Sequence, residues 1–111
     1  MHWFHVREKT QFQESKLNKV NLCESARMFC DVYCLEPGQE QLHTHDDPDK
    51  IYVVLSGRPT VIIGQEHRFL TPLEGAWAPA GAPHGATRGG SGRRCWYSRP
   101  GQRAKAKCGW R

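Results

Sequence analysis

The stretch that decides the fold is Gln41-Leu42-His43-Thr44-His45, with Ile51-Tyr52-Val53-Val54-Leu55-Ser56-Gly57 soon after it. Successive side chains of a strand point to opposite faces, so residues 41, 43 and 45 share one face. Two imidazoles on one face are a natural beginning for a metal site, because imidazole is the commonest protein ligand of transition metals. The apolar run at 51–55 predicts a buried strand, and Ser56-Gly57 predicts the turn that ends it.

The sequence on both sides of this stretch is also typical of short strands. Alternating, β-branched or aromatic residues predict strands at residues 27–35, 60–63, 67–70 and 76–78. Turn residues separate these segments, which recur about every 8 to 12 residues without a helical period. The chain is therefore expected to be all-β, a small antiparallel sandwich or barrel. Tyr52 and Trp77 are expected to be core or pocket-wall aromatics.

Length and composition point to one globular domain of 111 residues. No apolar run approaches the ~20 residues of a membrane span, and the start lacks a basic-then-apolar leader, so a cytoplasmic location is expected. The five cysteines are an odd number with no C-x-x-C pair, which favours thiols over a disulfide framework. Cys30 and Cys34 should share a face of one strand as small buried hydrophobes.

A third imidazole is expected from the second half of the chain, because two ligands are usually too few for a metal ion. Pro79-Ala80-Gly81-Ala82-Pro83-His84 is a stiff loop that would hold His84 at low entropic cost. His67 lies near a predicted hairpin turn and is expected at the surface. Three imidazoles with open positions form an acceptable site for Zn²⁺, Fe²⁺, Mn²⁺ or Ni²⁺.

Two segments together resemble a known superfamily. Pro37-Gly38 through His43-Thr44-His45 to Leu55-Ser56-Gly57 resembles the first motif of the cupins, and the loop at 79–84 resembles the second. The resemblance covers residues 27–85, just over half of the chain. It implies a small single-domain cupin barrel, an antiparallel double-stranded β-helix of jelly-roll type. It also implies that His43, His45 and His84 bind one divalent metal ion.

This sequence departs from the cupin motifs at several positions. Lys50 stands where the family has a metal-binding Glu, Leu73 where it has a Gly, and Arg88 where it has an Asn. A protonated ammonium cannot donate a lone pair, so Lys50 must lose its proton or bend away from a metal. The residues that remain for the fourth position or the pocket wall are Gln41, Lys50, Asp49 and Tyr52. The alternative is a degenerate cupin that binds no metal.

The C-terminal part of the chain does not look like the rest. Residues 1–24 are expected to be an N-terminal edge segment and residues 25–87 the barrel core. Residues 88–111 contain eight Lys or Arg and no Asp or Glu, whereas the whole chain has a net charge of +5. Only Cys95-Trp96-Tyr97 is strand-like there. A shifted reading frame turns these codons into apolar ones, so the tail is interpreted as a frameshifted closing strand; the alternative is a genuine basic extension.

Three functions fit these observations. The first is a metal-dependent enzyme of dioxygenase or isomerase type that acts on a small molecule, with Lys50 or Tyr52 as candidate bases. The second is a non-catalytic module that binds a small ligand or a metal, which the missing Glu favours. The third, nucleic-acid binding by the tail, lacks any binding motif and is not expected. A damaged closing strand would leave an edge that recruits a second copy, so a homodimer is expected.

Overall fold

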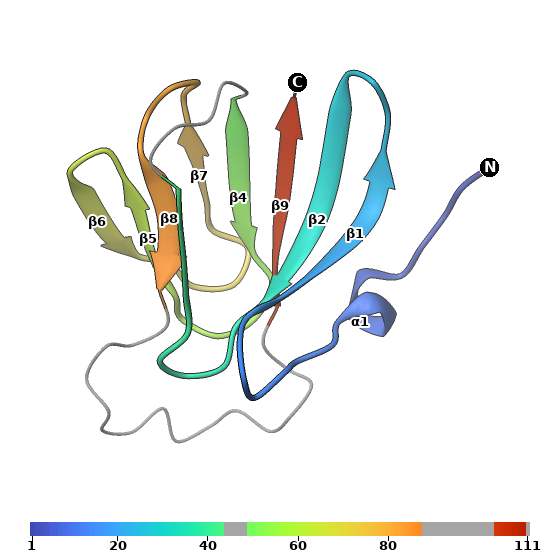
Figure 1. Cartoon of the computed structure of the whole chain (residues 1–111), viewed down its shortest axis with the longest axis horizontal. Coiled ribbons are helices and arrows are strands. Elements are labelled where there is room, and N and C mark those ends of the chain that lie inside the picture. The colour runs from blue at the N-terminus through green and yellow to red at the C-terminus, as the bar shows by residue number, and fades with distance from the viewer. Residues whose placement is uncertain (44–48, 88–103, 111) are drawn as a thin grey trace.

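Short antiparallel strands make up almost all of the regular structure in this computed structural model (Figure 1). The structure describes residues 1–43, 49–87 and 104–110, and for residues 41, 43 and 104–110 it describes the backbone alone. Nine strands and one short helix lie within these ranges. The expected all-β, antiparallel class is confirmed.

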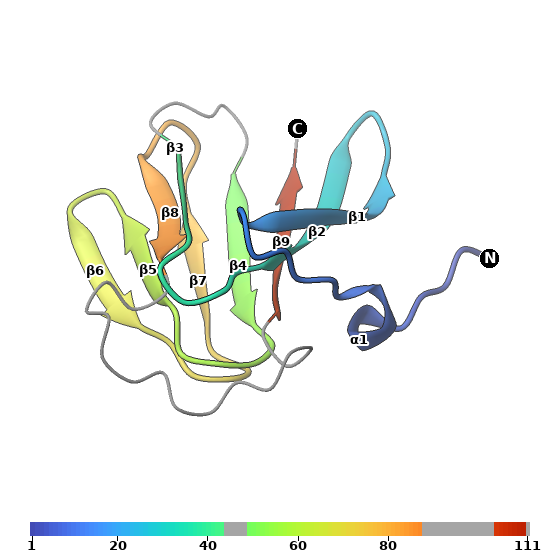
Figure 2. The ribbon, with the colours of Figure 1, turned by 60° about the horizontal axis from the view of Figure 1, so that its bottom comes forward.

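The strands form two sheets that pack against each other (Figures 1 and 2). The larger sheet has the order β1 (Asn18–Glu24), β2 (Met28–Cys34), β9 (Ala104–Trp110), β4 (Lys50–Val54) and β7 (Gly75–Ala78). The smaller sheet has the order β3 (Glu40–His43), β8 (His84–Thr87), β5 (Thr60–Ile63) and β6 (Glu66–Phe69). The core between them takes residues from both: Tyr52, Val54, Val61, Leu70, Ala78 and Ala86.

Glycine is required at two places in this framework. Gly64 begins the two-residue turn between β5 and β6 with a φ of 61°, which glycine adopts without steric cost. Gly75 begins β7 where that strand meets β4. A Cβ atom at Gly75 would lie 2.7 Å from the backbone oxygen of Tyr52, so a side chain would force the two strands apart.

The N-terminal segment covers the outer face of β1 and β2. A second apolar cluster consists of Leu22, Cys30, Val32 and Cys34. Phe4, Val6 and Phe12 pack on it, and helix α1 (Val6–Lys9) lies on this side of the molecule (Figure 2). The predicted edge strand is β1, whereas the single-turn helix was not predicted. No helix within the described residues is long and apolar enough to cross a membrane.

Two features differ from the sequence-based expectation. Strand β9, at Ala104–Trp110, fills the position between β2 and β4, although only Cys95-Trp96-Tyr97 was expected to be strand-like in the tail. Those three residues lie outside the described residues. Trp77 was expected in the core or a pocket wall, which is wrong, because 62% of it is exposed. It is the cross-strand partner of Ile51, which is itself 43% exposed, so both lie on the outer face of their sheet.

Candidate metal centre

His84 begins β8 and is almost fully buried, with 3% of its surface exposed. Its Nδ1 atom lies 2.8 Å from the carbonyl oxygen of Ala82. A carbonyl oxygen only accepts, so Nδ1 carries the hydrogen and donates it, which fixes the ring orientation. In the neutral ring the lone pair then lies on Nε2, which is also buried. This arrangement is typical of a histidine whose second nitrogen binds a metal.

His43 is the Cα partner of His84 in the pairing of β3 with β8. Directly opposite residues of an antiparallel pair lie on the same face of the sheet. The backbone therefore brings these two predicted ligands together, as a shared site requires. The side chains of Gln41 and His43, and all of His45, lie outside the described residues. Among the side chains that are described, no three His, Cys, Asp or Glu residues converge in a metal-binding group.

Three hydrogen bonds hold the loop that carries His84. Within the loop, Ala82 donates its backbone N–H to Pro79 over 3.1 Å. The backbone N–H of Gly64 donates to Pro83 over 2.7 Å. The backbone N–H of Ala80 donates to Oδ1 of Asp49, also over 2.7 Å. Asp49, a candidate for the fourth position, is exposed and ties this loop to the start of β4.

Lys50, which replaces the family's Glu, is 3% exposed at the start of β4. Its Nζ atom lies 5.9 Å from the centroid of the Phe29 ring on β2. The negative face of an aromatic ring attracts a cation at this distance. The Lys50 side chain therefore extends toward Phe29.

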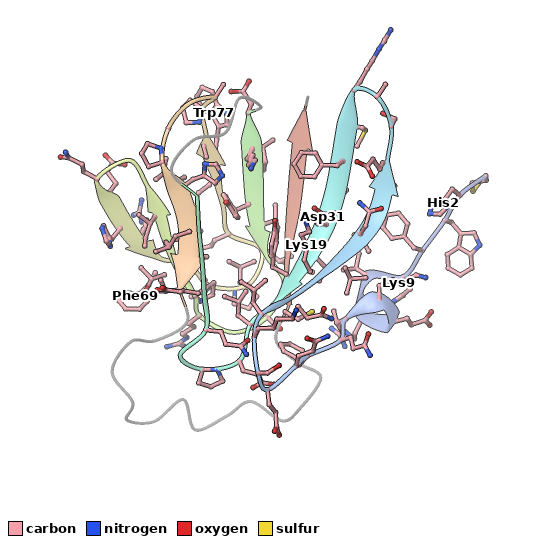
Figure 3. The ribbon with its side chains drawn as sticks, in the orientation of Figure 1. His2, Lys9, Lys19, Asp31, Phe69 and Trp77 are labelled. Carbon is pink, nitrogen blue, oxygen red and sulfur yellow. The ribbon has the colours of Figure 1, made fainter. Side chains whose placement is uncertain are left out.

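Buried polar groups continue the site from His84 toward β2. The ring centroid of Tyr52, which is fully buried, lies 6.1 Å from that of His84. Burial raises the pKa of Tyr52, and the nearby Tyr33 raises it further. Burial also raises the pKa of Tyr33, with a smaller contribution from the Asp31 carboxylate. Asp31, which is labelled in Figure 3, is 4% exposed. It accepts a hydrogen bond from Nδ2 of Asn21 over 2.7 Å.

Phe29, Asp31 and Tyr33 were not expected in this site from the sequence. A signal was present, because these three residues alternate with Met28, Cys30 and Val32 along one strand. Burial of a carboxylate in an otherwise apolar strand costs free energy unless polar groups surround it. Asp31 in this strand therefore predicts a polar site on the inward face. The two faces of β2 are both largely buried, so hydropathy alone does not tell which face is the interior.

The family model named Cupin domain matches residues 31–97, which is more than half of the chain. The chain belongs to the cupin family. His43 and His84 therefore both lie within a cupin domain. The antiparallel double-stranded β-helix predicted from the motifs is confirmed by this match and by solved structures that are similar to it.

Several solved structures are similar to this cupin. The structure of TT1209 from Thermus thermophilus shares 33% sequence identity, with a TM-score of 0.82, and the match covers 99% of this chain and 97% of that one. A Klebsiella pneumoniae protein with a double-stranded β-helix domain shares 21% identity, with a TM-score of 0.79 and coverage of 99% and 90%. KdgF from a Halomonas species shares 19% identity, with a TM-score of 0.72 and coverage of 100% and 96%. The last two show the fold alone. No curated protein matches the sequence.

Proposed function

We propose that this cupin binds one divalent metal ion, Zn²⁺, Fe²⁺, Mn²⁺ or Ni²⁺, through His43, His45 and His84. The observation that carries the proposal is the buried His84 ring, held at Nδ1 by the Ala82 carbonyl and opposite His43 in the strand register. The donor set fits a borderline transition-metal ion, because it consists of imidazole nitrogens, and the ring of His84 is held by its hydrogen bond to Ala82. A bound ion would supply Lewis-acid chemistry to a small molecule beside it.

The interior next to His84 suits a small polar ligand. Tyr52 and Tyr33 keep their hydroxyl hydrogens at neutral pH, since burial raises the pKa of both. Their hydroxyl groups are hydrogen-bond donors, and the Asp31 carboxylate, which accepts from Asn21, is an acceptor. These groups bind and orient a ligand in the proposal. The metal-dependent dioxygenase or isomerase expected from the motifs remains one form of this function, and a cytoplasmic location remains its expected setting.

The second form of the function is a binding module without catalysis. Lys50 favours it, because a buried cation at the position of the family's Glu removes one anionic ligand and leaves the ammonium at Phe29. Oxygen uptake and product analysis with candidate catechols, thiols and diketones distinguish the two forms, because a dioxygenase consumes oxygen whereas an isomerase only changes the substrate. Metal-dependent turnover of any of them supports the enzyme, and metal binding without turnover supports the module.

Metal content tests the proposal directly. Protein purified without a chelating column should carry metal by elemental analysis, and His43→Ala and His84→Ala should each lose most of it. The matched control is His67→Ala, an exposed histidine on β6, which should keep it. Thermal unfolding should show that all three variants fold. Equal metal content in wild type, His43→Ala and His84→Ala would remove the site.

Position 50 provides a gain-of-function test. Lys50→Glu should raise the affinity for a divalent ion by about tenfold or more, because it replaces a buried cation with an anionic oxygen ligand. Lys50→Met, which keeps the length of the side chain without the charge, should raise the affinity less. Titration with Zn²⁺ or Mn²⁺ measures both. A lower affinity for Lys50→Glu than for Lys50→Met would place position 50 away from the metal.

A further inference from the structure

Three cysteines occupy one row across three neighbouring strands of the larger sheet. Cys23 on β1 is the Cα partner of Cys30 on β2. Cys30 is in turn the Cα partner of Cys108 on β9, so it lies between the other two. Cys23 and Cys30 carry thiols rather than disulfides in this structure. The row lies outside the candidate metal centre and has no part in the proposed function.

An irregularity in β1 creates the first of these pairs. Asn21 pairs with Asp31, but Cys23 pairs with Cys30, so β1 has one extra residue, Leu22, at a β-bulge. In a regular strand Cys23 would lie on the same face as Asn21. The bulge instead turns Cys23 toward the face of Cys30. Both belong to the apolar cluster under the N-terminal segment, where Cys30 is 8% exposed and Cys23 is partly exposed.

The register places the Cα atoms of Cys23 and Cys30 at a separation that a disulfide can span. Directly opposite residues of an antiparallel pair have Cα atoms about 4.5 to 5.5 Å apart. A disulfide needs a Cα separation of about 4.4 to 6.8 Å with both Cβ atoms on one face. Cys34 provides the contrast on the same strand and in the same cluster. Its cross-strand partners are Asn18 and Ala104, so no thiol lies opposite it.

We propose that Cys23 and Cys30 form a thiol oxidation site that closes to a disulfide across β1 and β2 when the protein meets a peroxide. The partly exposed Cys23 reacts first. Its thiolate attacks the peroxide, an S–O bond forms as the O–O bond breaks, and water leaves after protonation. The Cys30 thiolate then attacks the Cys23 sulfur, the S–S bond forms, and the sulfenic oxygen leaves as a second water. Two thiols lose two electrons and the peroxide gains them.

The burial of Cys34 and the raised pKa of its thiol explain why it does not take part in this oxidation. Cys34 is 0% exposed, and burial raises the pKa of its thiol. Its sulfur also accepts a hydrogen bond from the backbone N–H of Gln11 over 3.4 Å. The reactive species in oxidation is the thiolate, so a buried thiol with a raised pKa reacts slowly. Cys34 is therefore the matched control within the same strand.

Cys30 also has a second candidate partner for a disulfide, Cys108, because the strand register places the two residues opposite each other. In a Cys23→Ser variant, Cys108 is the remaining thiol-bearing residue opposite Cys30, and the bond should move there. That bond would join β2 to the C-terminal strand β9, whereas the wild-type bond closes the β1–β2 hairpin. The position of the disulfide in each variant therefore reports the register of both strand pairs.

Peptide mapping after mild oxidation tests the proposal on the full chain. Treatment with hydrogen peroxide should remove the mass of two hydrogens and join the peptides that contain Cys23 and Cys30. Cys34→Ser should give the same bond, and Cys30→Ser should lower the disulfide yield about tenfold and leave a Cys23 sulfenic acid that dimedone traps. Thermal unfolding of the reduced variants confirms that each is folded.

Three results would overturn the inference. The first is a wild-type disulfide other than Cys23–Cys30, such as Cys30–Cys108 or one through Cys95. The second is an unchanged yield in Cys30→Ser. The third is a bond between two chains on a non-reducing gel, because the register places both sulfurs within one chain.

Discussion

At the scale of single residues, Leu73 bears a conformational cost that the family's glycine avoids. Its φ is 70°, in the left-handed region that costs an L residue about 1–2 kcal/mol. Its backbone N–H donates to Val54 over 2.8 Å, which holds the turn in this conformation. The side chain is 86% exposed, so it contributes little packing in return. The departure from the motif therefore weakens the fold at this position.

We expect Leu73→Gly to raise the free energy of unfolding by about 1 kcal/mol, since relief of the strain outweighs the added flexibility of the unfolded chain. Urea denaturation measures this change. The control is Leu42→Gly, at another exposed leucine, which lies in β3 and should lower the free energy of unfolding. A destabilised Leu73→Gly would contradict the argument from φ.

The two buried tyrosines give the protein a stability that depends on pH. The pKa of Tyr33 and of Tyr52 is raised above the ordinary value of 10.0. Each contributes its full stability below pH 10 and loses it as the pH rises toward the folded pKa, because only the unfolded chain ionises there. Above pH 10 the free energy of unfolding should fall by up to about 1.4 kcal/mol per pH unit for each tyrosine. Tyr52→Phe should flatten this slope in urea titrations between pH 9 and 11, and an unchanged slope would show that Tyr52 ionises in the folded state.

At the scale of elements, β9 lies in the middle of the larger sheet although its sequence does not predict a strand. It pairs antiparallel with β2 on one side and β4 on the other. Ala-Lys-Ala-Lys-Cys-Gly-Trp has little of the apolar, β-branched character of a central strand. The interpretation of residues 88–111 as a frameshifted closing strand stays a prediction, which the alternative reading frame of the gene tests. The backbone ladder, rather than side-chain propensity, explains why this segment is extended.

Lys107 lies in the middle of β9, opposite Asp31 and Tyr52. Lys107→Pro removes a ladder hydrogen bond between two neighbours and should cost about 3 kcal/mol or more of the free energy of unfolding. Lys107→Ala keeps the backbone donor and should cost much less, so the pair separates backbone pairing from side-chain effects. Thermal and urea unfolding provide the measurement. Equal stability of the two variants would mean that β9 does not close the sheet.

At the scale of the whole molecule, the expected homodimer depends on the edge strands of the sheets and on exposed apolar side chains. β1 and β7 end the larger sheet, and Trp77 and Ile51 lie exposed next to the β7 edge. Unpaired edges and apolar patches are typical places for a second copy to bind. Sedimentation should therefore show a species of twice the chain mass. Trp77→Glu should shift it toward the monomer, whereas Gln65→Glu, at an exposed polar residue of the turn between β5 and β6, should not. A clean monomer for the wild type would contradict the prediction.

The sequence by itself determined the strand-rich class and most strand positions. β5, at Thr60–Ile63, matches its predicted range, and β2, β4, β6 and β7 lie within a residue or two of theirs. It also determined the loop that carries His84. These features depend on local patterns, namely period-two alternation and turn residues, which need no knowledge of the rest of the chain. The family match at residues 31–97 follows from the same local motifs.

Only the tertiary structure decided which residues meet. It placed His43 opposite His84, set Lys50 near Phe29, and brought Tyr33 of β2 near Tyr52 of β4. It also turned Trp77 outward and set β9 between two strands far away in the sequence. These outcomes depend on register and on which face of a strand points inward, and a shift of one residue reverses every face. Where both faces of a strand are buried, as in β2, local hydropathy does not indicate which face points inward.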